Sequence, residues 1–255
     1  MTGYERRQEI VSIVTIRTSV RVGELAERLG VSDVTIRKDL SALEEMGLVV
    51  RTHGGVVLAE KSDEYTVLRA RRSRNESIKH ALARAALRLI SHGETVFIDS
   101  GSTCAQLAPL VVDMDLRVVT NSLDVMVALA NIPGIVLHST GGNYRQGGGS
   151  FIGPFAEEMI RRMNFDHAFI GTTGLSWDGR FSSQNIIEAQ TKRAVISAAR
   201  SSVVLCDAGK IWHDAFSVFA TAEDIDILIT NLDDAGTKRL EATGLHVVSS
   251  QEEGE

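Results

Sequence analysis

Two short polar turns in the second half of the chain have the composition of a phosphate-binding site. Asp99-Ser100-Gly101-Ser102-Thr103 ends one apolar run, and a helical pattern begins at Cys104. A strand, a hydroxyl-bearing turn and a helix N-terminus together present backbone N–H groups, a helix dipole and two hydroxyls to an anion. Thr120-Asn121-Ser122 ends the next run. Because ligands of open parallel sheets bind beyond the carboxyl ends of strands, we expect both turns to face one site, although serine and threonine are also ordinary N-caps.

Charged side chains follow similar positions further along the chain. In Gly141-Gly142-Asn143-Tyr144-Arg145 the glycines allow close approach and Arg145 brings a cation, while Asp207-Ala208-Gly209-Lys210 follows another apolar run. Lys210 fits either a ligand contact or a surface loop. Glu188 and Lys192 stand one helical turn apart, so an exposed ion pair worth a few tenths of a kcal/mol explains them as well as a ligand role does.

The elements that must position these residues alternate between short apolar runs and helical patterns. A helix is expected over 78–90, and helical segments separate most of the runs that follow. This alternation is typical of βαβ units, and near-continuous apolar strands suit a parallel sheet covered on both faces. The sequence therefore predicts an α/β domain, with strands at 95–99, 117–120, 135–138, 167–171, 203–207 and 225–230.

The first 57 residues predict short helices followed by a β-hairpin. A first helical pattern covers 6–15, and Val22 to Leu29 forms a short amphipathic helix that Gly30 ends in a left-handed conformation. Ser32 then fits the N-cap of a helix reaching about Met46, on which Ile36, Leu40 and Leu43 form one buried stripe. Apolar runs on either side of His53-Gly54-Gly55 complete a winged helix-turn-helix pattern.

The face opposite the buried stripe has side chains suited to the major groove of DNA. Val34, Lys38 and Ser41 point away from the core, with Thr35 and Arg37 on the flanks, where a hydroxyl and a guanidinium reach phosphates or base edges. Ser32 and the free N–H groups of the first turn offer a phosphate site, and the hairpin residues Arg51 and His53 can contact the adjacent backbone. A three-helix adaptor without a DNA partner is the alternative.

Composition excludes several classes of protein. The formal net charge is −6, and residues 1–57 hold eight Lys/Arg and eight Asp/Glu, so no uniformly basic DNA-binding surface is expected. Two cysteines are too few for a disulfide framework or a zinc site, and we expect neither a metal nor a cofactor. No apolar run approaches 18 residues and the N-terminus has no apolar signal-peptide core, which predicts a cytoplasmic protein with no membrane contact.

The chain is expected to form two domains. Residues 1–58 are the winged helix-turn-helix, with the helix-turn-helix itself at about 20–39, and 78–250 are the α/β domain. Residues 59–77 are polar and lack periodicity, which indicates a linker. The arginines in it, which serve either as a solvated connector or as supplementary phosphate contacts, are Arg69, Arg71, Arg72 and Arg74.

The segment from Leu29 to Leu40 resembles the helix-turn-helix of the DeoR family of bacterial sugar-operon regulators. It reads LGVSDVTIRKDL, and the later Arg51-Thr52-His53-Gly54-Gly55 is similar to the wing of that family. Asp33 and Val34 fall where the family pattern is permissive, so the resemblance makes them candidates for operator-specific contacts. The candidate DNA-binding residues are Ser32, Asp33, Val34, Thr35, Arg37, Lys38, Arg51 and His53.

The second half is similar to the DeoR sugar-phosphate sensor domain, which is itself related in fold to ribose-5-phosphate isomerase. The resemblance places effector contacts in the polar turns, the Gly-Gly…Arg segment and an Asp-x-x-Lys segment. Where the family often has Ser-Ser-Lys, this chain has Ala208-Gly209-Lys210, which removes two possible donors to sugar hydroxyls. The candidate effector-binding residues are Asp99, Gly101, Ser102, Thr103, Asn121, Ser122, Gly142, Arg145, Asp207 and Lys210.

These observations favour a transcriptional regulator that represses a carbohydrate-utilisation operon until a phosphorylated sugar binds. Its expected partners are double-stranded operator DNA and a second copy of the chain, as a dimer or tetramer, since one recognition helix makes too few contacts for specific affinity. A sugar-phosphate isomerase is the alternative, with Lys210 as electrophilic donor and Glu188 or Asp207 as base. An isomerase, however, has no use for the N-terminal module.

Overall fold

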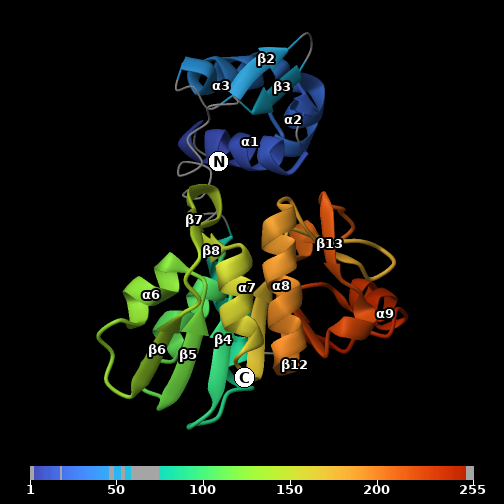
Figure 1. Ribbon diagram of the computed structural model, residues 1–255. Helices are drawn as coiled ribbons and strands as arrows, with labels where there is room; N and C mark the ends of the chain where they lie inside the picture. The colour runs from blue at the N-terminus through green and yellow to red at the C-terminus, as the bar shows by residue number, and fades with distance from the viewer. Residues whose placement is uncertain (1–2, 18, 46–48, 53–54, 59–74, 251–255) are drawn as a thin grey trace. The chain divides into compact units, whose positions relative to one another are not determined.

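The computed structural model describes residues 3–17, 19–45, 49–52, 55–58 and 75–250 (Figure 1). The chain divides into two compact units, residues 1–74 and 75–255, each with its own hydrophobic core. His53 and the four arginines at 69–74 lie outside the described residues, so their predicted roles stay predictions.

The described residues of the first unit form three helices and a small antiparallel sheet. Its sheet has the order β1-β3-β2, so the strand before the helix-turn-helix pairs with the far strand of the hairpin. The elements are α1 (Gly3–Arg17), β1 (Ser19–Arg21), α2 (Val22–Leu29), α3 (Asp33–Glu45), β2 (Val49–Thr52) and β3 (Gly55–Leu58).

The core of this unit is built from the stripe predicted on α3. Ile36 and Leu40 are fully buried and Leu43 nearly so, packed with apolar residues of α1 and α2. Gly30 ends α2 with φ of 64°, a left-handed conformation that favours glycine, and its N–H closes the last turn of the helix. The predicted helix stop and buried stripe are both confirmed.

The second unit is a seven-stranded parallel sheet with helices on both faces. Its strand order is β15-β14-β12-β9-β4-β5-β6, and every adjacent pair runs parallel. The strands are β4 (Thr95–Ile98), β5 (Leu116–Thr120), β6 (Ile135–Ser139), β9 (Phe165–Gly171), β12 (Ala199–Cys206), β14 (Ile227–Thr230) and β15 (Val247–Ser249).

Two separate apolar clusters cover the two faces of this sheet. Alternate side chains of β4 show the division, because Phe97 belongs to one cluster and Val96 and Ile98 to the other. Helices α5 (Glu76–Leu87), η1 (Cys104–Leu110) and α6 (Leu123–Leu129) supply one layer. Helices α7 (Pro154–Arg161), α8 (Ile186–Ala198) and α9 (Asp234–Glu241) supply the other, with α7 and α8 side by side (Figure 1).

All six predicted strands are present, and the structure contains further strands that the apolar runs of the sequence did not indicate. The seventh strand, β15, was not predicted. Further antiparallel pieces are the hairpin of β7 (Asn143–Arg145) with β8 (Ser150–Ile152), and a sheet of β10 (Gly174–Leu175), β11 (Phe181–Ser183) and β13 (Ser217–Ala220).

Two helix predictions need correction. The segment after the first polar turn is a 3-10 helix with Pro109 inside it, because proline has no N–H for an α-helical hydrogen bond. The helix that follows the turn is thus a 3-10 helix, and the contribution of its N-terminus to anion binding stays a prediction. Helix α5 begins at Glu76, inside the predicted linker, where the sequence indicated a start at Ile78.

Candidate DNA-binding face and strand-end site

The exposed face of α3 presents the residues that the sequence predicts for DNA binding. Ser32, Asp33, Val34, Arg37 and Lys38 are all exposed, and Val34 shows 71% of its surface. The Val34 side chain is so exposed at the start of the helix that it contributes nothing to the core. It is therefore available to a partner such as a thymine methyl. The helix thus separates a buried stripe from a surface of two cations and one apolar contact.

The N-terminus of α3 is capped as the sequence predicts. The Thr35 N–H donates to Ser32 Oγ at 3.3 Å, and the two hydroxyls lie 2.9 Å apart. The half-buried Thr35 is therefore joined to the cap, and both hydroxyls stay at the exposed end of the helix. This arrangement holds the first turn and its free N–H groups in place.

Asp39 has a structural role within the same helix. Its carboxylate is 3% exposed and pairs with Arg6 at 2.5 Å and Arg7 at 3.3 Å, both on α1. A carboxylate next to the DNA-binding face would repel phosphates, but this one is neutralised by two guanidinium groups from another helix. The pairs join α1 to α3 and leave Arg37 and Lys38 as the cations of the exposed face, with Asp33 as an exposed carboxylate at its start.

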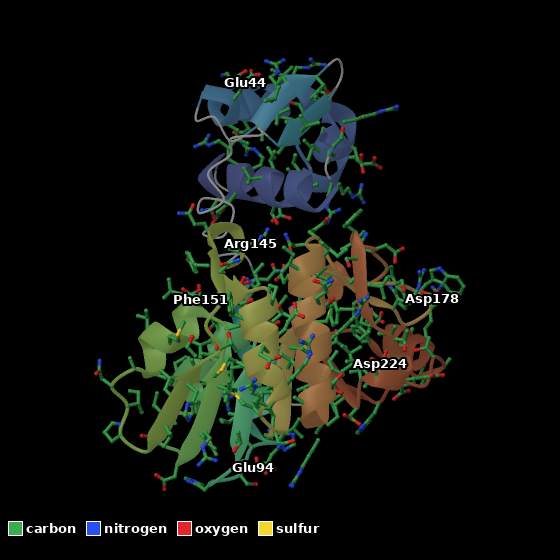
Figure 2. All side chains as sticks on the ribbon, viewed as in Figure 1. Glu44, Glu94, Arg145, Phe151, Asp178 and Asp224 are labelled. Atoms are coloured by element: carbon green, nitrogen blue, oxygen red, sulfur yellow. The ribbon has the colours of Figure 1, made fainter. Side chains whose placement is uncertain are left out.

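The wing strand β2 is joined to α3 through Arg51. Its guanidinium donates to Ser41 Oγ at 3.2 Å and its N–H donates to Glu44 Oε1 at 3.2 Å, while Ser41 Oγ donates to the Arg37 carbonyl at 3.0 Å. Arg51 is exposed, so its remaining donors can reach a phosphate. Figure 2 labels Glu44, which lies near the C-terminal end of α3.

In the second unit, the topological switch point of the sheet lies between β4 and β9. The strands that follow β4 are added on one side as β5 and β6, and the later strands on the other. Loops leave the carboxyl ends of adjacent strands in opposite directions at such a point, which opens the crevice where α/β proteins bind ligands. Asp99 directly follows β4, and Gly171 ends β9.

A buried ion pair occupies this switch point. Asp99 is 1% exposed and accepts hydrogen bonds from the Lys192 ammonium and from Gly171 N at 3.1 Å, and Lys192 also donates to the Gly171 carbonyl at 2.9 Å. Burial lowers the pKa of Lys192, but the Asp99 and Glu188 carboxylates more than offset it, so the pKa lies above its ordinary value. The interpretation of Glu188 and Lys192 as an exposed ion pair is wrong.

The two polar turns lie next to each other, as their positions after adjacent strands require. The Ser100 N–H donates to Asn121 Oδ1 at 2.9 Å, and Gly101 has φ of 109° with open space where a side chain would begin. Ser122 caps α6 by accepting from Val125 N at 3.4 Å. These contacts commit one N–H of the first turn and two side-chain oxygens of the second to structure, and leave other groups of the turns available.

Three buried hydroxyls around these turns have no hydrogen-bond partner among the described residues. They are the side-chain oxygens of Ser100, Thr103 and Ser150, which are at most 3% exposed. Ser150 reaches the second turn because β8 pairs with it, through a bridge to Ser122 and a 2.7 Å hydrogen bond from Phe151 N to the Asn121 carbonyl. Buried polar groups are normally satisfied, so three together mark a place for a ligand or water.

Arg145 stands at the end of β7, where Figure 2 labels it. Its guanidinium lies 3.7 Å from Glu188, and Glu188 also accepts from Ser183 Oγ at 3.0 Å. Gly142 is required for packing, because a Cβ there would lie 2.8 Å from the Ile152 carbonyl, and its φ is 105°. Its predicted effector contact is therefore limited to the backbone.

Asp207 and Lys210 pair with each other at 3.5 Å, and Asp207 also accepts from Gly209 N at 3.1 Å. The pKa of the Cys104 thiol is raised to about 12, chiefly by burial and also by the Asp99 charge, against the lowering effect of Lys192 and Lys210. Asp99 after β4, Lys192 on α8 and Lys210 after β12 thus all act on the pKa of Cys104, the first residue of η1. The sequence-predicted residues of three separate segments converge at this edge of the sheet.

Sequence reasoning missed several polar groups of this edge. Lys192 was left open between two roles, and Ser100, Ser150 and Ser183 were not singled out as site residues. A buried lysine has no sequence signal beyond helical spacing, and the serines lie in segments whose pairing depends on the fold.

Within the described ranges no helix is long and apolar enough to cross a membrane.

Comparison with known proteins decides the family. The DeoR-like helix-turn-helix domain matches residues 6–62, and the DeoR C-terminal sensor domain matches residues 74–232. The chain belongs to the DeoR family. Its two units are thus a DNA-binding domain and a sensor domain of one family of transcriptional regulators.

Relatives of this DeoR-family chain match it along nearly its full length. The transcriptional repressor AccR of Agrobacterium fabrum is 32% identical, over 92% of this chain and 91% of its own. The lactose phosphotransferase system repressor of Staphylococcus epidermidis is 31% identical over 98% and 100%, and the regulator GlpR of Haloferax volcanii is 33% identical over 97% and 98%. Each of these proteins is named as a regulator or repressor of transcription.

Among solved structures, ribose 5-phosphate isomerase A of Methanocaldococcus jannaschii is similar to the DeoR-family sensor unit. The two chains are 18% identical with a TM-score of 0.40, over 54% of this chain and 55% of the isomerase. A likeness of this size carries no argument about activity.

Proposed function

We propose that this DeoR-family chain is a repressor of a carbohydrate-utilisation operon, that α3 and the wing bind its operator, and that a phosphorylated sugar bound at the strand ends relieves repression. Support for the DNA contact comes from the exposed face of α3, where Arg37 and Lys38 stand beside Val34 and the capped first turn. The proposed phosphate and base contacts are Ser32, Asp33, Val34, Thr35, Arg37, Lys38, Arg51 and His53.

One observation carries the effector proposal. The hydroxyls of Ser100, Thr103 and Ser150, which have no partner among the residues that the structure describes, lie at two linked turns beside the topological switch point, near Arg145, Lys192 and Lys210. Hydroxyl donors and cations together suit an anion that also carries hydroxyl groups, which is the chemistry of a sugar phosphate. The proposed contacts are Gly101, Ser102, Thr103, Asn121, Ser122, Gly142, Arg145, Asp207 and Lys210, and Asp99 acts by holding Lys192 in place.

We infer regulation without catalysis at this site. An isomerase needs a carboxylate free to take a proton from a substrate carbon. In the described part of the chain, Asp99 is bound to Lys192 and Gly171, Asp207 to Gly209 and Lys210, and Glu188 to Ser183 and Arg145. Each carboxylate at the strand ends thus already has internal partners.

The proposed assembly is a dimer or tetramer that works in the cytoplasm, where operator DNA is found. Two recognition helices double the number of phosphate and base contacts, and the spacing of two half-sites then follows from the protein's symmetry. We propose 1–58 as the DNA-binding domain and, because α5 begins at Glu76, a linker that ends before this helix and a sensor domain that extends from it to about residue 250.

Operator binding with and without sugar phosphates tests this function. Binding of the full-length protein to a promoter fragment from beside its own gene is expected to weaken by roughly 5- to 150-fold with the correct sugar phosphate, the range of ordinary allosteric coupling. The matched unphosphorylated sugars should have no effect. Equal responses to both would contradict a phosphate-reading site, and no binding to any promoter fragment would contradict the repressor.

A further inference from the structure

We propose that Glu188 is a specificity-determining residue of the strand-end site. Its carboxylate pairs with the Arg145 guanidinium until a ligand binds whose phosphate takes Arg145 and whose hydroxyl groups donate to Glu188. Phosphorylated polyols are therefore accepted and inorganic phosphate is refused. The inference rests on the proposed function, because it concerns how the same site chooses its effector.

Glu188 is held in position by its own helix and by a neighbouring strand. It lies in the first turn of α8, where Asn185 Oδ1 accepts from the N–H groups of Ile187 and Glu188 at 3.0 Å each. Its carboxylate accepts from Ser183 Oγ on β11 at 3.0 Å, and its side chain is 17% exposed. The charge is therefore fixed at the strand ends and only partly screened by water.

The contact between Glu188 and Arg145 is loose enough to be exchanged. At 3.7 Å the two groups attract each other without a hydrogen bond, and Arg145 donates no side-chain hydrogen bond to the residues that the structure describes. The Asp99–Lys192 pair differs, because both groups are almost fully buried and hydrogen-bonded. Of these two ion pairs, the one at Arg145 offers more donors to an incoming anion, because two of the three N–H groups of Lys192 are already used.

A second donor stands beside the Arg145 guanidinium. The position that a Cβ of Gly148 would occupy lies 2.8 Å from an Arg145 guanidinium nitrogen and 2.6 Å from Ser150 Oγ. Ser150 is fully buried and its hydroxyl has no partner among the described residues. The guanidinium and the hydroxyl thus lie close together against the bare Cα of residue 148, where any larger side chain would collide with both. Two neighbouring donors of this kind suit an anion.

The Glu188 carboxylate decides which anion can bind the Arg145 guanidinium and the Ser150 hydroxyl. Inorganic phosphate would take Arg145 and leave the partly buried Glu188 with the Ser183 hydroxyl but without its guanidinium, next to a second negative charge, which is unfavourable. A sugar phosphate brings hydroxyl groups that donate to Glu188 in place of the guanidinium, so neither partner is left unsatisfied. Selection then comes from repulsion of the wrong ligand as much as from attraction of the right one.

Titration of the full-length protein with inorganic phosphate by calorimetry tests this role. Glu188→Gln keeps the shape of the side chain and an acceptor for Ser183 but removes the charge. It is expected to bind inorganic phosphate about tenfold more tightly than wild type, and Glu188→Ala should show a gain of the same direction. Adding Arg145→Gln to Glu188→Gln should abolish the gain. Glu157→Gln on α7, whose carboxylate pairs with Arg161 at 2.9 Å, removes an equal charge and should change nothing.

The outcomes separate this inference from the proposed function. No gain in Glu188→Gln and Glu188→Ala, a gain that persists without Arg145, or an equal gain in Glu157→Gln would each overturn it. If the gain is absent while the wild-type operator complex still responds to sugar phosphates, the inference is wrong and the proposed function stands. A gain in phosphate affinity that requires Arg145 would support the role of Glu188. If no sugar phosphate then changed operator binding by the same protein, the proposed effector would be contradicted.

Discussion

The cations of α3 and the cations of the strand ends differ in what surrounds them. Arg37 and Lys38 are exposed, and neither makes an ion pair within the described residues of the first unit. At the strand ends, Lys192, Arg145 and Lys210 each face a carboxylate of their own unit. The exposed face of α3 leaves its two cations to water, and the strand ends neutralise theirs internally.

This difference matches the two ligands proposed for the units. DNA is a polyanion whose counterions are released by exposed cations, so open charges give binding that depends strongly on salt. A small effector must instead be distinguished from every other cellular anion. Internal carboxylates make this discrimination possible, because the net binding free energy of a ligand is only the part by which its contacts exceed those of the carboxylate that it replaces. The neutral charge balance of residues 1–57 is compatible with DNA binding, since Asp39 is neutralised by α1 and does not face the DNA.

The largest effect is expected from breaking the most deeply buried pair. Lys192→Met leaves Asp99 buried with only the Gly171 N–H as partner, and breaking a buried pair on one side lowers the free energy of unfolding by about 3–5 kcal/mol. Both tryptophans, Trp177 and Trp212, lie in the second unit, so urea unfolding followed by tryptophan fluorescence reports on that unit alone.

Two controls sharpen this test. Arg162→Met breaks an exposed pair with Glu158 and should change the unfolding free energy by no more than about 1 kcal/mol. Asp99→Asn combined with Lys192→Met should recover part of the loss, because no unpaired charge remains. A loss below about 1 kcal/mol for Lys192→Met alone would show that the strand ends are as open to water as α3.

Removing a cation from the open face should weaken DNA binding without loss of stability. Arg37→Ala is expected to lower operator affinity by about 1–3 kcal/mol, and to reduce the slope of log affinity against log salt by about 1 if Arg37 binds a phosphate. A gel-shift titration at several salt concentrations measures both. Arg162→Ala removes the same charge from the second unit and should leave the affinity unchanged. If the two variants behave alike, α3 is not the recognition helix.

A smaller effect is expected from the pH dependence of the second unit. Burial raises the pKa of Cys104 from 9.0 to about 12, so the folded state keeps its proton where the unfolded state loses it. The resulting stability is complete below pH 9 and falls as the pH rises towards 12. Between pH 8 and 10 this thiol should account for a loss of about 1.4 kcal/mol.

Comparing Cys104→Ala with wild type isolates that contribution. The variant loses a buried side chain, so its stability at pH 8 is not the informative quantity. The difference in unfolding free energy between pH 8 and 10, measured by urea titration, should be smaller in the variant by about 1.4 kcal/mol. Equal differences in the two proteins would mean that water reaches the thiol below the strand ends.

The sequence was informative where one local pattern decides the structure. The stripe of Ile36, Leu40 and Leu43, the Gly30 stop and six apolar strands each depend on neighbours along the chain. The Asp99–Lys192 pair joins residues 93 positions apart, and it exists because β9 lies beside β4. Helical spacing places Glu188 and Lys192 on one face but gives no indication that their partners come from different strands.

Short strands were missed for a related reason. Strands β7, β8, β10 and β11 have two or three residues, too few to show alternation, and they form through pairing with segments that only the fold brings close. Ser150 and Ser183 lie on two of these strands. The residues that complete the proposed effector site are therefore those for which the sequence carries the weakest signal.

Operator binding by the Ser102→Ala, Thr103→Ala double variant tests most directly the claim that the strand-end site governs the DNA-binding face. Both residues lie in the turn after β4, in a different unit from α3, so affinity for the operator without ligand should equal that of wild type. Weakening by the active sugar phosphate, roughly 5- to 150-fold in wild type, should be lost. A double variant that responds as wild type does would contradict the account, because the effector would then be bound elsewhere.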